Sequence, residues 1–245
     1  MTHLVETVSR ALELGAQGHS ATEVSRLIGV PRGTVRDWLA GRAPRRKHGC
    51  PACGDSHDLQ GLPTHYAYLL GMYLGDGCIS RHRREVFKLR ISLDARYPEI
   101  VSACEDSIQE LVPRNKVARV NRGTWWEVYA YSKTWPCLFP QHGPGRKHER
   151  AIVLTHWQWQ SVSRRPDLLL RGLLHSDGCR FQSTGRGGWS HPRYSFVNAS
   201  TDIRRIFCEA CDLLGFHWTK SGKRTIYVSR KADVALLDLL VGPKR

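Results

Sequence analysis

Acidic residues are scarce in this sequence, where 22 Asp and Glu stand against 37 Lys and Arg in 245 residues. The formal net charge is therefore +15. A balance of this kind favours a polyanionic partner, and nucleic acid is the commonest one. A basic protein without such a partner is the open alternative.

Long apolar runs are also missing. No stretch approaches the ~20 residues that a membrane-spanning helix needs, so we expect no membrane association. The opening residues, "MTHLVETVSRALELG", lack the basic start and apolar centre of a signal peptide. We therefore expect a cytoplasmic, nucleoid-associated protein whose eight cysteines stay reduced, which favours metal binding or packing over disulfides.

The apolar spacing over residues 1–43 predicts three short helices. Ser20 and Glu23 have the spacing of a capping box at the start of the second one. The segment resembles the helix-turn-helix domains of site-specific recombinases and small bacterial regulators, in which the third helix enters the major groove of DNA. This resemblance assigns DNA contacts to Arg32, Thr34 and Arg36. A three-helix packing module without DNA contacts stays open.

A basic linker is predicted over residues 44–65. Its first part, "RAPRRKH", either tracks phosphates through Arg45, Arg46 and Lys47 or forms a solvated connection.

Two cysteine pairs have the spacing Cys-x-x-Cys. Cys50 and Cys53 in "CPACG" resemble a zinc knuckle, although a structural zinc needs four ligands, so an unmetallated pair is the alternative. The second pair, Cys208 and Cys211, lies in a helical pattern and is predicted to pack in a core.

Two segments of the remaining chain share one pattern. "LLGMYLGDGC" and "LRGLLHSDGC" align without a gap, and in each an apolar helix ends at Asp-Gly, with Asp76 and Asp177 lying 101 residues apart. Two copies of one pattern indicate two copies of one structural unit. We place these repeats at residues 66–140 and 167–245, joined by a linker over 141–166.

Each repeat is predicted to continue with the same order of elements. After the first motif, "VFKLRISL" alternates apolar and polar residues as a half-buried strand does, and a helix over 98–111 and two strands follow. The second repeat gives "RYSFVNAS", a helix over 201–214, two strands and a last helix over 234–240. The predicted fold class is α+β, with two pseudo-symmetric αββαββα repeats after a small all-α helix-turn-helix domain.

The doubled Asp-Gly pattern resembles the LAGLIDADG homing endonuclease family in its single-chain, two-repeat form. The resemblance runs from about residue 66 to the C-terminus. It implies that the two motif helices pack side by side and that the strands form a saddle on double-stranded DNA. A monomer is expected, because two repeats supply the internal symmetry of a dimer. Close helix packing is implied at four small residues: Gly71, Gly75, Gly172 and Ser176.

The chemistry that the resemblance implies is metal-dependent cleavage of both DNA strands. Asp76 and Asp177 would lie together at the helix ends, and close carboxylates repel each other unless a cation lies between them. Mg²⁺ suits such a site because it prefers oxygen ligands and can activate water. Gly77 and Gly178 are expected to let the chain leave each helix without steric cost. A structural pair of capped or salt-bridged carboxylates is the alternative.

Basic residues are expected near these carboxylates, because the family often carries one at each active site. Aligning Val128 with Ile226 places Lys133 opposite Lys231 at matching strand ends, where each either stabilises the transition state or contacts phosphate. The inter-repeat segment adds a basic run that could clamp phosphate through Arg146, Lys147, His148 and Arg150. The strand faces and the loop over 183–193 give the other predicted DNA contacts: Lys88, Arg90, Tyr129, Tyr131, Arg193, Tyr227 and Ser229.

One position departs from the family pattern. Many members carry an acidic residue two positions before the catalytic Asp, where this sequence has Leu74 and His175. The resemblance places no metal ligand there. The sequence therefore predicts a site-specific, magnesium-dependent endonuclease of homing type, and a non-cleaving DNA-binding regulator and an RNA-binding splicing cofactor are the alternatives.

Overall fold

The computed structural model describes residues 5–42, 53, 58–59 and 61–242. The chain divides into two compact units, Met1–Cys50 and Pro51–Arg245. None of the helices in these described ranges is long and apolar enough to cross a membrane.

The first unit is helical and has its own apolar core, which includes Val35 and Trp38. Ser20 Oγ accepts a hydrogen bond from the backbone N–H of Glu23, whose carboxylate accepts one from the backbone N–H of Ser20, so the predicted capping box is present. Gly29 ends the second helix with a left-handed φ of 67°, which glycine adopts readily. The elements are α1 (Val5–Ala16), α2 (Ala21–Ile28), α3 (Arg32–Asp37) and a helical turn η1 (Trp38–Arg42).

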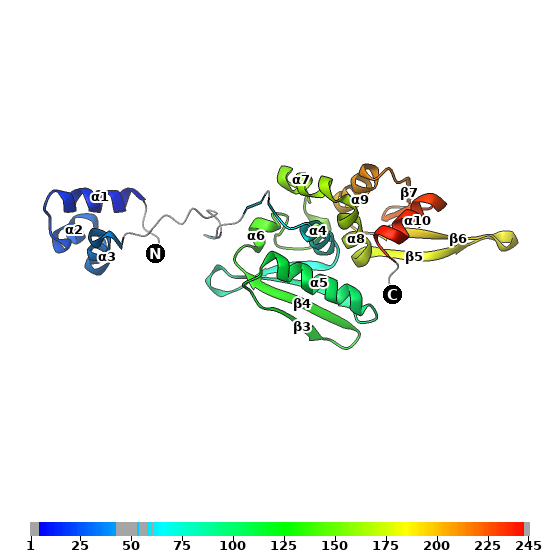
Figure 1. Cartoon of the computed structure of the whole chain (residues 1–245), viewed down its shortest axis with the longest axis horizontal. Helices are drawn as coiled ribbons and strands as arrows, with labels where there is room; N and C mark the ends of the chain where they lie inside the picture. The colour runs from blue at the N-terminus through cyan, green and yellow to red at the C-terminus, as the bar shows by residue number, and fades with distance from the viewer. Residues whose placement is uncertain (1–4, 43–52, 54–57, 60, 243–245) are drawn as a thin grey trace. The chain divides into compact units, whose positions relative to one another are not determined.

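The second unit contains both repeats, and each has the predicted order of elements (Figure 1). The first repeat comprises α4 (His65–Asp76), β1 (Gly77–Arg81), β2 (Phe87–Asp94), α5 (Pro98–Leu111), β3 (Val117–Asn121), β4 (Trp125–Ser132) and α6 (Trp135–Leu138). The second comprises α8 (Pro166–Asp177), β5 (Gly178–Thr184), β6 (Ser190–Val197), α9 (Thr201–Leu213), β7 (Trp218–Ser221), β8 (Thr225–Val228) and α10 (Lys231–Leu240).

The inter-repeat segment is more ordered than a linker. It contains the helix α7 (His156–Arg164), which begins with a capping box between Thr155 and Gln158. The Gln158 side chain is buried and donates a 2.8 Å hydrogen bond to the phenol oxygen of Tyr66. This polar contact with α4 adds to the apolar packing of the helix, in which Val162 is buried in the core and Trp157 and Trp159 pack against it.

Each repeat folds its strands into one antiparallel sheet, with the orders β1-β2-β4-β3 and β5-β6-β8-β7. The registers are equivalent, because Val128 and Ile226 each lie level with the glycine that follows the motif aspartate. The predicted alignment of these two residues is therefore confirmed.

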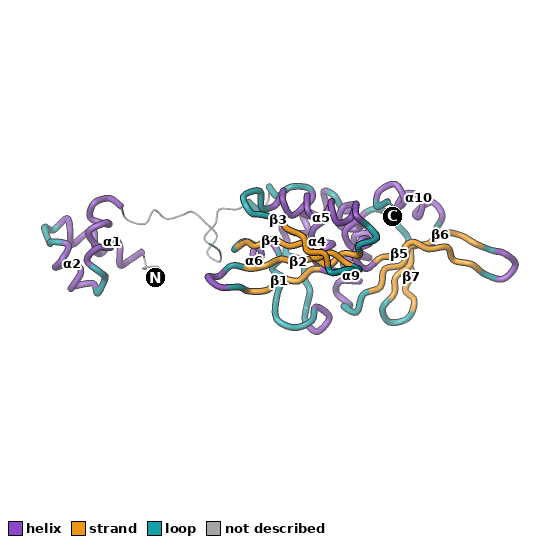
Figure 2. Tube along the Cα trace, turned by 90° about the horizontal axis from the view of Figure 1, so that it is seen from below, coloured by secondary structure: helices purple, strands orange, loops and turns teal. Residues whose placement is uncertain are grey.

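Helices cover one face of the sheets and leave the other face to polar side chains. In Figure 1, α5 lies across the first sheet, where it contacts β3 and β4. Leu89, Ile91 and Val128 point into this buried side. The main difference between the repeats is the β5–β6 hairpin, which Figure 2 shows projecting well beyond the other strands.

Candidate functional site

The two motif helices, α4 and α8, pack directly against each other because glycines remove side chains where they cross. A Cβ atom built on Gly71 would lie 2.6 Å from the carbonyl oxygen of Leu169. One built on Gly172 would lie 2.2 Å from the carbonyl oxygen of Tyr68. A larger residue would have to push backbone apart in a close-packed interior, so these glycines set the distance between the helices.

The same close approach continues to the ends of the helices. A Cβ on Gly75 would lie 2.1 Å from Ser176 Oγ and 3.0 Å from Asp177 Oδ2. The carboxylate of Asp177 therefore lies beside the residue that precedes Asp76. Both helices end at their aspartate, where Asp76 is exposed and Asp177 is half-buried. The structure thus brings the four small residues and the two carboxylates together.

The glycines after the aspartates avoid a steric cost, as expected, but not through backbone freedom. Gly77 has φ −85° and Gly178 has φ −94°, which are values that any residue adopts. A Cβ on Gly77 would instead lie 2.5 Å from Tyr73 Cα, and one on Gly178 would lie 2.6 Å from Leu174 Cα. Glycine is needed here for close packing of each strand on its own helix, and not for backbone freedom.

A lysine from the inter-repeat segment reaches the ends of the two motif helices. We call this place, where Asp76 and Asp177 lie, the junction. Lys147 Nζ donates hydrogen bonds of 2.6 Å to the carbonyl oxygens of Tyr73 and Gly75, in the last turn of α4. Carbonyls at a helix C-terminus carry partial negative charge and favour a cation. The loop that carries Lys147 is fixed by Arg150, whose guanidinium donates to the carbonyl oxygen of Gly145. The basic run was the sole sequence signal for this lysine, and it did not separate Lys147 from its neighbours.

The charged groups that act on Lys147 include both aspartates. Burial lowers the pKa of Lys147 to about 8, while the carboxylates of Asp177 and Asp76 favour its charged form. Burial also raises the pKa of Tyr73 to about 12, which keeps its phenol neutral. The junction therefore combines two carboxylates, one ammonium group and the carbonyl oxygens of a helix end.

The donor set at the junction suits a hard divalent cation. Asp76 and Asp177 supply carboxylate oxygens, which Mg²⁺ prefers together with water and phosphate oxygens. Within the part of the chain that the structure describes, no group of three or more His, Cys, Asp or Glu gathers to hold a metal. Water and substrate oxygens would therefore complete the coordination shell.

The surroundings of the two carboxylates differ. Asn198 Nδ2 donates a 2.6 Å hydrogen bond to Asp177 Oδ2. Asp76 borders an open cleft that also contains Asp94 and Arg96, which form an ion pair of 2.6 Å. The two halves of the junction are thus chemically distinct.

His175, at the position that departs from the family pattern, is buried between helices. Its Nδ1 lies 3.0 Å from the phenol oxygen of Tyr68, and its Nε2 lies 3.3 Å from the carbonyl oxygen of Val241. It therefore links α4, α8 and the residue that follows α10.

The two predicted strand-end lysines, Lys133 and Lys231, lie in different settings. Val128 and Ile226 are level with the start of β1 and β5, and each lysine lies five residues further along, beyond the end of its strand. At ~3.3 Å per strand residue, β4 carries Lys133 away from the helix ends. Lys231 is the first residue of α10, because β8 already ends at Val228. The register thus does not support Lys133 beside the carboxylates, whereas the role of Lys231 stays a prediction, and a cation whose contacts reach the helix ends is Lys147.

The outer face of the first sheet carries the predicted DNA contacts, but one of them is neutralised. Lys88 lies opposite Tyr131 in the register, and Arg90 lies opposite Tyr129. Lys88 Nζ is 2.5 Å from Glu127 Oε1 and 4.1 Å from the centroid of the Tyr129 ring. Because this ion pair is largely buried, Arg90 is the exposed cation of the central strand.

The corresponding face of the second sheet carries Arg193 and Tyr227. Phe181 lies opposite Arg193 in the register, and its ring centroid is 6.1 Å from that of Tyr227. The Arg193 guanidinium is 5.4 Å from the centroid of the Trp189 ring, which is 46% exposed near the hairpin tip. Ser229 directly follows the last residue of β8.

The first unit presents the predicted residues of α3, where Arg32 and Arg36 are exposed and Thr34 is half-buried. Cys208 and Cys211 are buried in α9, in agreement with their predicted packing role. Cys53 is half-buried. Four predicted residues lie outside the described ones: Arg45, Arg46, Lys47 and Cys50.

Comparison with known proteins identifies the fold. No protein-family model and no curated protein sequence matches the chain. The structure is similar to that of the homing endonuclease I-DmoI in complex with DNA and Mn, with a TM-score of 0.50 and 15% identity over 75% of this chain and 98% of that chain.

Two further solved structures give lower scores. The LAGLIDADG meganuclease I-AabMI bound to uncleaved DNA has a TM-score of 0.45 at 9% identity, covering 71% of this chain and 82% of that chain. The N-terminal LAGLIDADG domain of DUF199/WhiA has a TM-score of 0.45 at 15% identity, covering 76% and 89%. The similarity to I-DmoI, together with the paired motif helices and the two equivalent sheets, leads us to conclude that the second unit has the fold of the LAGLIDADG homing endonucleases.

Proposed function

We propose that this protein is a metal-dependent endonuclease that cleaves double-stranded DNA at a specific site. The observation that carries the proposal is the junction of Asp76, Asp177 and Lys147 at the ends of two packed helices. The net charge of +15 supports a DNA partner, because cations on the protein displace counterions from phosphates. The fold also supports it, since I-DmoI has been solved in complex with DNA and Mn.

The junction has the parts that phosphodiester hydrolysis needs. Asp76 and Asp177 would hold Mg²⁺, which when bound would activate a water and neutralise charge on the leaving oxygen. An ammonium group has three N–H donors, and two of those on Lys147 go to carbonyl oxygens. The third can donate to a phosphoryl oxygen as negative charge develops there. Lys147 also reduces the repulsion between the aspartates and a phosphate.

The two sheets would contact DNA on either side of the junction. Arg90 and Arg193 lie on the outer faces, where cations would bind phosphates and polar side chains would read base edges. Because Asp177 is held by Asn198 whereas Asp76 borders an open cleft, the two DNA strands would meet different half-sites. That difference suits an asymmetric target.

Incubation with a plasmid library of random inserts in Mg²⁺ tests the proposed cleavage. We expect linear products that share one target sequence. Asp76→Asn and Asp177→Asn keep the side-chain shape but remove the charge, and either should abolish the linear product. If the unmodified protein binds the library and leaves it intact in both Mg²⁺ and Mn²⁺, the endonuclease proposal is wrong.

A non-cleaving DNA-binding regulator is the second candidate. The separate helical unit Met1–Cys50 favours it, because α3 exposes Arg32 and Arg36 as a recognition helix would. Deleting residues 1–60 separates the candidates. An endonuclease would still cut, with an affinity reduced by the lost base contacts at ~1–3 kcal/mol each. A regulator would lose all site preference, and the full-length chain would never cut.

A structural zinc at Cys50 and Cys53 and a monomeric state are further parts of the proposal. Elemental analysis of the full chain tests the zinc, and Cys50→Ser with Cys53→Ser should remove it. Zinc that is absent, or that survives both substitutions, would leave an unmetallated pair. Light scattering on the DNA-free protein tests the monomer.

A further inference from the structure

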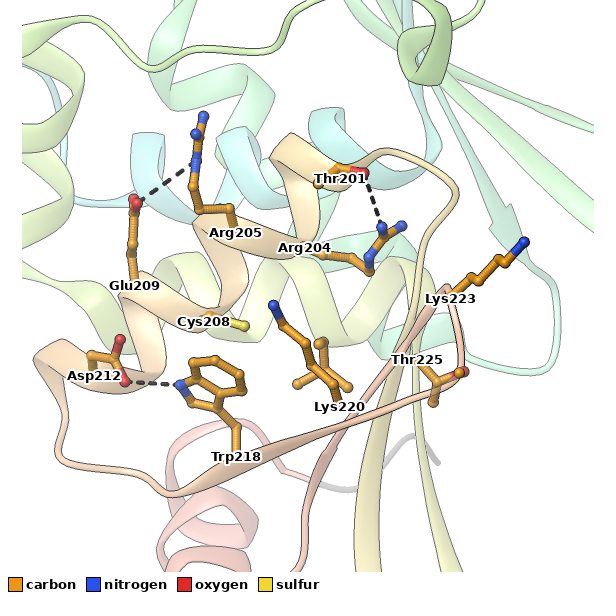
Figure 3. A pocket seen from close by; sticks show the side chains of 12 residues that line it. Thr201, Arg204, Arg205, Cys208, Glu209, Asp212, Trp218, Lys220, Lys223 and Thr225 are labelled. Carbon is orange, nitrogen blue, oxygen red and sulfur yellow. Dashed lines mark hydrogen bonds and ion pairs between the residues drawn. The ribbon is translucent and has the colours of Figure 1, made fainter.

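A second group of cations lies in the second repeat, around a cleft between α9 and the β7–β8 hairpin. The cleft has a volume of about 450 Å³. Figure 3 shows Trp218 and Cys208 on one side of it and Arg204 and Lys223 on the other, with Lys220 beside Trp218. The Nζ atom of Lys220 lies 5.7 Å from the centroid of the Trp218 ring. These three cations come from α9, from β7 and from the turn that follows β7, so the fold gathers them from separate segments.

The same position in the first repeat is neutralised. Arg119 is the equivalent of Lys220. In the strand register Arg119 lies opposite Val128, Lys220 lies opposite Ile226, and these two partners occupy equivalent positions in the repeats. Arg119 Nη1 is 3.4 Å from Glu105 Oε2, so the first repeat pairs this cation with its own helix.

Three of the four cations that line the cleft have no such pairing, and the fourth, Arg205, pairs with Asp202 and Glu209. Within the described residues, neither Lys220, Lys223 nor Arg204 forms an ion pair with a carboxylate. The two acids in the lining are engaged by other lining residues: Glu209 lies 3.8 Å from Arg205, and Asp212 accepts a 2.8 Å hydrogen bond from Trp218 Nε1. Arginine and lysine side chains that lie together without a carboxylate partner are typical of phosphate-binding sites.

Two contacts pre-organise the cleft for a ligand. Arg204 donates to Thr201 Oγ1 and to the carbonyl oxygen of Asn198, which hold its guanidinium in place. The hydrogen bond to Asp212 fixes the Trp218 indole, an aromatic surface on which any base can stack. The volume lies within the range of about 300–1,000 Å³ that is usual for small-molecule sites.

We propose that this cleft binds the phosphate group of a nucleotide, with the base against Trp218. The phosphate is either that of a free nucleotide or that of a DNA strand that continues past the junction, since Asn198 contacts both Arg204 and Asp177. The proposal needs no cleavage, so it stands or falls separately from the endonuclease activity.

Calorimetric titration of the full chain, without divalent cations, tests the site with thymidine 5′-monophosphate, inorganic phosphate and thymidine as probes. We expect the monophosphate to bind and thymidine not to bind. Lys220→Gln with Lys223→Gln should weaken this binding by about tenfold or more, the usual effect of losing charged hydrogen bonds. Arg119→Gln is the matched control in the first repeat and should leave it unchanged. Unchanged thermal unfolding of the double variant excludes misfolding.

Duplex binding over a salt series distinguishes the two sources of phosphate. If the DNA backbone is the source, the double variant should reduce the log–log salt slope by about 0.9, for one phosphate that is no longer neutralised, and should also weaken binding of the monophosphate. If a free nucleotide is the source, the slope stays unchanged while the monophosphate binds. The proposal is overturned if neither phosphate probe binds and the slope is unchanged, or if Arg119→Gln weakens binding as much as the double variant does.

Discussion

Lys147 Nζ donates a 2.6 Å hydrogen bond to the carbonyl oxygen of Gly75, the residue immediately before Asp76. A residue of the inter-repeat segment thus closes the end of a helix in the first repeat. Because α4 and α8 are packed without side chains at their crossing, the same ammonium also lies near Asp177. One cation therefore serves both halves of the junction.

Replacing Lys147 by Met should slow cleavage by about 10²–10³-fold, the usual effect of removing one donor to a developing oxyanion. DNA affinity should change much less, and Lys147→Arg should restore part of the rate. Lys133→Met is the matched control, because Lys133 lies beyond the far end of β4. Single-turnover cleavage and gel-shift assays measure the two effects. Equal slowing by both Met variants would contradict the role of Lys147.

Asp76→Asn combined with Asp177→Asn should tighten DNA binding in the absence of divalent cations, because two charges that repel phosphate are removed. The DNA affinities of the parent and of the variant should both fall steeply with salt. The slope of log affinity against log salt concentration should be about −0.9 for each neutralised phosphate. Gel shifts across a salt series measure this. A flat plot would exclude nucleic acid as the partner, and weaker binding by the variant would show that the carboxylates do not face DNA.

Gly71→Ala should lower the free energy of unfolding by at least ~1–3 kcal/mol, the usual cost of overpacking a core. The added Cβ would lie 2.6 Å from the carbonyl oxygen of Leu169, and backbone cannot move aside as a flexible side chain can. Gly143→Ala is the control, since its Cβ would be no nearer than 3.5 Å to another atom. Urea unfolding measures both. A Gly71→Ala midpoint equal to that of the parent would show that the helices can separate at no cost.

Acid should destabilise the first sheet through Glu127. The hydrogen bond from Lys88 lowers the pKa of Glu127 below its ordinary value of 4.5. The unfolded chain therefore takes up this proton first, so the stabilisation is complete above about pH 4.5 and is lost as the pH falls through the lower folded value. Urea unfolding at a series of acidic pH values should show a shallower loss of stability for Glu127→Gln. The exposed Glu85→Gln is the control, and an identical pH profile for both variants would contradict the assignment.

The sequence by itself determined the repeats, the order of elements and the faces of the strands. These follow from local periodicity: an apolar helix ends at each Asp-Gly, and alternation in "VFKLRISL" separates a buried from a polar face. The alignment of Val128 with Ile226 held in the structure because side chains that alternate along a strand fix its register against a buried core. The close crossing of the motif helices was implied by the family resemblance, and the small residues placed on one side of each helix allow it.

Only the tertiary structure decided where the charges meet. The strand-end lysine Lys133 lies away from the carboxylates, and Lys88 is held by Glu127. Lys147, which the sequence offered as one basic residue among several, reaches Asp76 and Asp177. The physical reason is that the interaction between two charges depends on the distance between them. For residues far apart in the chain, this distance depends on which strands pair and on the path by which a segment returns to the core. Neither is encoded in local periodicity.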